Sequence, residues 1–272
     1  MEVNSPLSPD ALAGRHAIVC GASAGIGRAT ALALASAGAE LTLISRSADK
    51  LAELANVCIE RGSPATHVVP IDLEDGRAID GVIPRHIGEN GPIHILVNNA
   101  GGPPSGPLLD AGDEDFLKPL RRHLFAAQRM VRHCLPGMEA SGYGRIVNIV
   151  STSVREPIAN LGVSNTVRGA MAGWSKTLAS ELPPAVSINN ILPGPFDTER
   201  MHANIQVNAE KAGLSVEEMT KRKAAPNPAA RARAPKAVPA PTPLPPSPLY
   251  TPAAAPDPHS VHPVDPPTLP PT

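Results

Sequence analysis

The sequence predicts an α/β protein whose doubly wound parallel β-sheet is covered by helices on both faces, in three layers. Short apolar runs alternate with amphipathic stretches through residues 1–225. Most of these runs lack polar alternation, which is typical of parallel strands buried on both faces. Glycine-rich and polar motifs directly follow several runs, at the carboxyl ends of the strands, where such sheets bind ligands.

Six apolar runs are the predicted strands. They span residues 16–20, 40–45, 67–71, 93–98, 145–150 and 186–192. Helical spacing of apolar residues predicts helices between them. These span residues 26–38, 48–61, 113–141 and 164–182. The segment after Glu74 is predicted to be a poor helix, because Gly76, Gly81 and Pro84 interrupt it.

A change of composition at residue 226 divides the chain into two parts. Residues 226–272 hold 17 of the 33 prolines and no glycine. Such a segment buries too little apolar surface to offset the entropy of ordering it. We therefore expect one folded domain over residues 1–225 and a disordered proline-rich tail over residues 226–272.

Composition and charge exclude several classes of function. The net charge of −1 gives no electrostatic field that would attract nucleic acid or an anionic membrane. No apolar run approaches the length of a membrane span. The three cysteines lie in regular segments without metal-ligand spacing, which indicates reduced thiols, a cytoplasmic protein and no metal site.

A glycine-rich turn follows the first strand directly and begins the first helix. A dinucleotide pyrophosphate needs backbone N–H donors at a helix N-terminus, and glycine allows the backbone to approach it closely. The strand and helix on either side make this turn more specific than a glycine-rich turn alone. The cofactor-binding residues predicted here are Gly21, Ser23, Ala24, Gly25, Ile26 and Gly27.

With three further motifs in order, residues 12–222 closely resemble the short-chain dehydrogenase/reductase family, which has a Rossmann-type fold. The Gly-x3-Gly-x-Gly turn is joined by Asp72 with Leu73, by Asn-Asn-Ala-Gly at residues 98–101, and by Pro193 with Gly194. The resemblance implies a homodimer that buries helices 113–141 and 164–182. It also implies further cofactor contacts at Asp72, Leu73, Asn99, Ala100, Gly101, Val150, Arg168, Pro193, Gly194 and Thr198.

The end of the second strand decides which dinucleotide binds. An acidic residue there would accept hydrogen bonds from a ribose 2′-hydroxyl, whereas a basic residue would pair with a 2′-phosphate. The chain has Ser45 and Arg46 at this position. The sequence therefore favours NADP(H) over NAD(H).

The catalytic motif departs from the family pattern. The family serine is present as Ser151, but Ser164 stands at the tyrosine and Arg168 at the lysine of Tyr-x3-Lys. The asparagine of the proton relay falls on His123. This Ser-x3-Arg pattern is similar to that of a subgroup labelled 3-oxoacyl-carrier-protein-reductase-like.

Two functions remain open on these residues. The first is an NADP(H)-dependent oxidoreductase that reduces a carbonyl, with an oxoacyl thioester as the first candidate, or oxidises a secondary alcohol. In this hypothesis Arg168 holds the ribose and stabilises an oxyanion, Ser151 and Ser164 orient the carbonyl, and water or His123 supplies the proton. The alternative is a cofactor-binding protein without turnover, acting as a sensor or oligomer partner.

The end of the domain also differs from the family. The family sheet ends with a seventh strand that bears a Gly-Gly, whereas the last glycine here is Gly213 and the family pattern stops after Arg222. The last strand is therefore predicted to be absent, through either a shift of reading frame or a native tail. Residues 196–219 are predicted to be a variable loop that covers the substrate, and nothing in them identifies that substrate.

Overall fold

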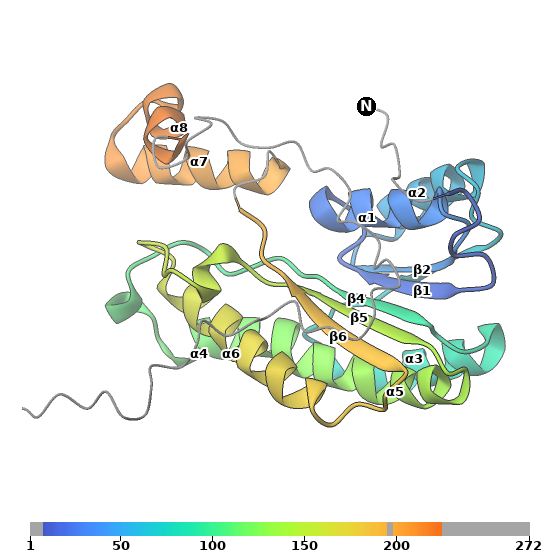
Figure 1. Cartoon of the computed structure of the whole chain (residues 1–272). Coiled ribbons are helices and arrows are strands. Elements are labelled where there is room, and N and C mark those ends of the chain that lie inside the picture. The colour runs from blue at the N-terminus through green and yellow to red at the C-terminus, as the bar shows by residue number, and fades with distance from the viewer. Residues whose placement is uncertain (1–7, 195–197, 225–272) are drawn as a thin grey trace, which may run out of the picture. The chain divides into compact units, whose positions relative to one another are not determined.

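The structure is a computed structural model that describes residues 8–194 and 198–224 (Figure 1). Within these residues the chain forms one six-stranded parallel sheet in the order β3-β2-β1-β4-β5-β6. Its strands are β1 (His16–Cys20), β2 (Glu40–Ser45), β3 (Thr66–Pro70), β4 (Ile95–Asn98), β5 (Gly144–Ile149) and β6 (Val186–Ile191). The strand order reverses beside β1, whose neighbours are β2 and β4, so the predicted doubly wound α/β fold is confirmed.

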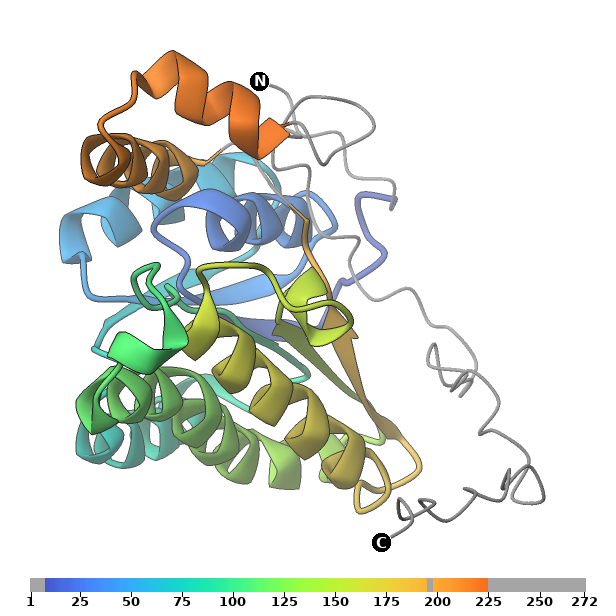
Figure 2. The ribbon, with the colours of Figure 1, turned by 90° about the vertical axis from the view of Figure 1, so that its left-hand side faces the viewer.

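Helices cover both faces of the sheet (Figure 1). One face carries α1 (Gly25–Ala35) and α2 (Ala48–Glu60). The other carries α3 (Gly76–Asn90), α4 (Asp113–Leu120), α5 (Ala126–Ala140) and α6 (Gly162–Ala179). Figure 2 shows the same two layers from the side. Short helical segments complete this part of the chain: η1 (Leu108–Asp110), the π-helical η2 (Arg121–Phe125) and η3 (Thr152–Val154).

Alternating side chains of the strands build a core on each face. Leu41 and Leu43 of β2 pack with α1 and α2, while Ile44 packs on the opposite face with α3. All three side chains are fully buried. Because both faces of these strands are buried, their sequences are continuous apolar runs.

The segment after Glu74 corrects one expectation. It forms the 15-residue helix α3, although Gly76, Gly81 and Pro84 lie within it. The carboxylate of Asp75 caps the helix by accepting hydrogen bonds from two backbone amides of the first turn. Ile79 and Ile83, one turn apart, are fully buried. Packing and capping therefore outweigh the low intrinsic helix propensity.

The long helix expected over residues 113–141 is present, but it is not regular. Its middle turn, η2, is π-helical and carries His123. Pro119 lies in α4 before this turn, and Pro136 lies in α5 after it. π-Helical turns inside α-helices are often found at functional sites.

The last described segment is helical rather than a loop. It contains α7 (Glu199–Ala212) and α8 (Val216–Ala224), which meet at Gly213 in the left-handed conformation. The expectation of a variable loop over residues 196–219 is wrong for this helical part, because a left-handed glycine ends one helix and lets another begin.

The last strand of the described sheet in chain order is β6, which pairs only with β5 among the described residues. Among residues 8–194 and 198–224, no seventh strand pairs with β6. The predicted tail over residues 226–272 lies outside the described residues. No helix in the described ranges combines the length and apolar character needed to cross a membrane.

Candidate cofactor and catalytic site

Between β1 and the first turn of α1, two positions have space only for glycine. Gly21 and Gly25 have φ angles of +60° and +55°. A Cβ on Gly27 would lie 2.1 Å from the carbonyl oxygen of Gly21, and a Cβ on Gly21 would lie 2.7 Å from the Asn99 side chain. The bare backbone of this turn therefore forms a cradle at the carboxyl end of β1.

Asn99, directly after β4, holds this cradle in place. Its side-chain nitrogen donates to the carbonyl oxygens of Cys20 and Gly21 at 3.2 and 3.3 Å. These bonds join the ends of two neighbouring strands at the point where the strand order reverses. Below them, the side chain of Asn98 donates to Asn148 at 2.8 Å.

Two helix N-termini meet at the cradle. No side chain caps α1, and its first turn carries no acidic residue. The methyl carbon of Thr198 would lie 3.5 Å from a Cβ on Gly25, and the Thr198 hydroxyl caps α7 by accepting from the amide of Met201. The amides of α1 and the positive end of its dipole suit a pyrophosphate, so the cradle fits a dinucleotide.

Arg46 lies beside the carboxyl ends of β2 and β3. Its guanidinium is 3.7 Å from the Asp72 carboxylate, and its side chain is 72% exposed. Asp72 also accepts a hydrogen bond from the amide of Glu74, and the hydroxyl of Ser45 accepts one from the amide of Ser47. The structure thus places a cation directly after β2, with the Asp72 carboxylate beside it.

Arg168 and His123, predicted separately, are in direct contact. The Nη1 of Arg168 donates to the carbonyl oxygen of Ile149 at 2.8 Å and contacts the Nδ1 of His123 at 3.3 Å. The Nε2 of His123 lies 3.1 Å from the carbonyl oxygen of Gly101. An arginine can only donate, so Nδ1 accepts and the Nε2–H donates to Gly101. These contacts fix the orientation of the His123 ring.

The two candidate serines occupy different elements. Ser151 follows β5 and accepts a hydrogen bond from the amide of Ser153, while Ser164 lies one turn before Arg168 on α6. Both serines are partly exposed, whereas Arg168 is buried. Within the described residues, no hydrogen bond joins one serine to the other.

Sequence reasoning missed two contributors to the site. Arg122 donates to the carbonyl oxygen of Gly101 and forms an ion pair with Glu74, beside His123. Asn148 is fully buried, and its side chain donates to Ser175 at 2.6 Å. An asparagine inside an apolar strand was the available signal, because a buried amide must be hydrogen-bonded.

The cysteines take no part in this chemistry. Cys20, Cys58 and Cys134 are free and buried, as expected. Burial raises the pKa of the Cys20 thiol to about 12, so it is not a nucleophile at neutral pH.

Residues 15–209 match the family described as short chain dehydrogenase. The chain belongs to this family. The L-xylulose reductase of Mesocricetus auratus is 35% identical over 184 residues, which cover 67% of this chain and 72% of that protein. Ketoacyl reductase HetN of Nostoc sp. is 30% identical over 206 residues, which cover 75% of this chain and 71% of that protein.

The solved structures agree with the sequence relatives. The L-sorbose reductase of Gluconobacter frateurii, complexed with NADPH and L-sorbose, superposes with a TM-score of 0.77 at 28% identity. The match covers 84% of this chain and 88% of that chain. The family predicted from the cofactor motifs is therefore confirmed, and these relatives are reductases of carbonyl groups.

Proposed function

We propose that this short chain dehydrogenase is an NADP(H)-dependent oxidoreductase that reduces a carbonyl or oxidises a secondary alcohol. The observation that carries the proposal is the cradle of Gly21 and Gly27, where backbone atoms leave no space for a Cβ. It lies at the N-terminus of α1 and at the reversal of strand order, where sheets of this type bind dinucleotides.

Arg46 supports NADP(H) as the cofactor. Its ion pair with Asp72 is exposed, and such pairs contribute about 0 to 1 kcal/mol. A 2′-phosphate offers a stronger, charge-assisted partner. The NADPH complex of the related L-sorbose reductase agrees with this choice.

The bound nicotinamide would supply or accept the hydride, and the chain would position the reactants. Arg168 is a permanent cation, fixed by Ile149 and His123, that would stabilise developing negative charge. Ser151 and Ser164 would donate hydrogen bonds to the carbonyl oxygen. Both ring nitrogens of His123 are engaged, so we propose that water supplies the proton and that His123 positions Arg168.

For the substrate we propose a 3-oxoacyl thioester. The support is the similarity to ketoacyl reductase HetN and the resemblance of the Ser-x3-Arg pattern to the reductase-like subgroup. The chain is also similar to reductases of L-xylulose and L-sorbose, so a short ketose is the second substrate to be tested.

A second candidate function rests on the burial of Arg168. A guanidinium bonded to a backbone carbonyl and a histidine can act as a structural link alone. The chain would then bind the nucleotide without turnover, as a sensor or an oligomer partner.

Single-turnover reduction separates the two candidates. The purified chain with bound NADPH is mixed with 3-oxoacyl esters or ketoses, and the loss of nucleotide absorbance is followed. We expect turnover with one class and a clear loss of rate in Ser164→Ala, whose fold is checked by circular dichroism. No turnover above the uncatalysed rate in either protein would support the binding function.

We also propose a homodimer that buries the exposed apolar residues between β4 and α5. Leu108 and Phe125 are about half exposed, and Leu109 is almost fully exposed. Sedimentation should give twice the monomer mass, and Leu109→Glu should shift it to the monomer.

A further inference from the structure

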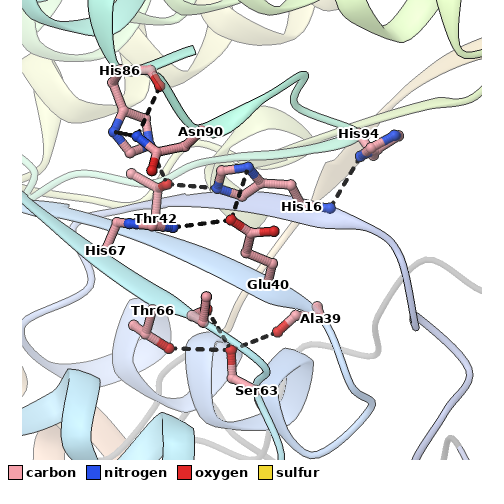
Figure 3. A network of polar contacts seen from close by, with 11 residues as sticks. His16, Ala39, Glu40, Thr42, Ser63, Thr66, His67, His86, Asn90 and His94 are labelled. Carbon is pink, nitrogen blue, oxygen red and sulfur yellow. Dashed lines mark hydrogen bonds and ion pairs between the residues drawn. The ribbon is translucent and has the colours of Figure 1, made fainter. Parts of the chain in front are cut away.

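A cluster of histidines lies at the amino ends of the strands, away from the cofactor cradle. His16 is the first residue of β1, Glu40 is the first of β2, and His67 is the second of β3. The cradle lies at the opposite, carboxyl end of β1. Figure 3 shows the cluster, with His86 of α3 and His94 beside it.

Strand register places the three side chains on one face of the sheet. His16 pairs with Glu40, and His67 pairs with Thr42, two residues after Glu40. Side chains two residues apart on a strand share a face. Ile18 and Ile44, further along this face, lie in the core under α3 and α5.

The ligand-type atoms of this cluster are close enough to share one ion. The Oε1 of Glu40 lies 3.0 Å from the Nε2 of His67 and 3.7 Å from the Nδ1 of His16. All three atoms lie within 4.8 Å of one another. Tetrahedral ligands at about 2.0 to 2.1 Å from a metal are about 3.3 Å apart, so small side-chain movements would complete the set.

The Nδ1 of His16 is a second, independent indication of an ion-binding site. Its Nδ1 is buried and has no hydrogen-bond partner among the described residues. Its Nε2 contacts the hydroxyl of Thr42 at 2.7 Å, and the Nε2 of His86 contacts the same hydroxyl at 2.7 Å. The Nδ1 of His16 lies 3.7 Å from the Oε1 of Glu40, beyond hydrogen-bond distance.

A cation between His16 and Glu40 would satisfy both the buried Nδ1 and the carboxylate, and the Nε2 of His67 contacts the same carboxylate oxygen. The outer partner Thr42 resembles the groups that orient metal-binding histidines.

We propose that His16, Glu40 and His67 bind one divalent transition-metal ion through Nδ1, a carboxylate oxygen and Nε2. Two imidazoles and a carboxylate suit Zn²⁺, with a fourth position left for water. Glu40 and His67 are each about one-third exposed, which gives the ion a path to the site. The bound ion would clamp β1, β2 and β3 at the end opposite the cofactor.

A titration of the metal-free, full-length protein tests this site. Co²⁺ is added and its visible absorption is followed, and Zn²⁺ is then used to displace it. We expect one equivalent to bind and Zn²⁺ to raise the melting temperature, because the ion binds only the folded chain. The absence of saturable binding to the folded protein would overturn the proposal.

Variants locate the ion. His67→Ala and Glu40→Gln should weaken Co²⁺ binding by about tenfold or more. His16 is not replaced first, because its side chain is buried in the fold. The matched control is His133→Ala, since His133 contacts Asp80 at 2.9 Å and neither residue belongs to the cluster. Wild-type affinity in His67→Ala, or an equal loss in His133→Ala, would place the ion elsewhere and refute the assignment. NADPH affinity should be the same in all variants.

Discussion

At the scale of single residues, the cofactor site depends on glycines where one added carbon atom would prevent the turn from forming. Gly27 is the clearest, because its hydrogen is all that fits between α1 and the carbonyl oxygen of Gly21. The sequence predicted this glycine from the spacing of its motif. The contacts of Asn99 with the same turn could not be predicted, because they join residues far apart along the chain.

Gly27→Ala should lower the affinity for NADPH by at least about tenfold, since the added methyl must displace the turn. The measurement is a fluorescence titration of the nucleotide. The control is Gly81→Ala, because nothing lies within 4 Å of a Cβ there and the residue is in the interior of α3. The control should bind NADPH normally and be more stable by about 0.5 to 1 kcal/mol. Normal binding by Gly27→Ala would contradict the cradle.

Arg46→Ala should weaken NADPH binding by about tenfold or more, because one charge-assisted hydrogen bond to the 2′-phosphate is lost. The affinity for NADH should change little, because that nucleotide lacks the 2′-phosphate. Titrations with both nucleotides measure the ratio directly. An equal loss for the two nucleotides would show that Arg46 does not contact the phosphate.

At the scale of elements, packing decides where sequence patterns fail. Helix α3 forms despite its glycines and proline, because Ile79 and Ile83 bury one face and Asp75 caps its start. The strand boundaries differ from prediction by no more than two residues, since apolar runs mark buried strands well. The π-helical turn that aims His123 has no such signal.

The histidine cluster could not be predicted from the sequence. His16, Glu40 and His67 lie on three strands and have no ligand spacing in the sequence. Only the order and register of the sheet bring them together. The expectation of no metal site rests on cysteine spacing alone, and the Co²⁺ titration tests it.

Helix α6 carries the altered catalytic pair one turn apart. The double variant Ser164→Tyr with Arg168→Lys should raise the single-turnover rate by about 10² to 10⁴, the usual contribution of a positioned general acid. A parallel thermal melt is needed, because the replacement also removes the contacts of Arg168 with Ile149 and His123. An unchanged rate in a folded double variant would show that the missing acid does not limit the reaction.

At the scale of the whole molecule, the described sheet resembles that of the family without its last strand. Within residues 8–194 and 198–224, strand β6 forms an edge of the sheet, and its side chains are only partly buried after Val186. An edge strand exposes backbone groups to other chains. The sequence predicted this ending from the loss of the family pattern after Arg222.

Residues 226–272 are proposed to be a tail that the nucleotide site does not need. A chain that ends at residue 225 should therefore bind NADPH with the affinity of the full-length protein and show the same melting temperature. Both proteins can be compared by titration and by calorimetry. A large loss of affinity or stability in the shorter chain would show that the tail packs on the domain.

The central claim is that the turn after β1 holds a dinucleotide, and a titration of the purified full-length protein with NADPH tests it most directly. We expect saturable binding of one nucleotide per chain in the micromolar range, tighter for NADPH than for NADH. A protein that melts cooperatively yet shows no saturable binding of either nucleotide would contradict the claim.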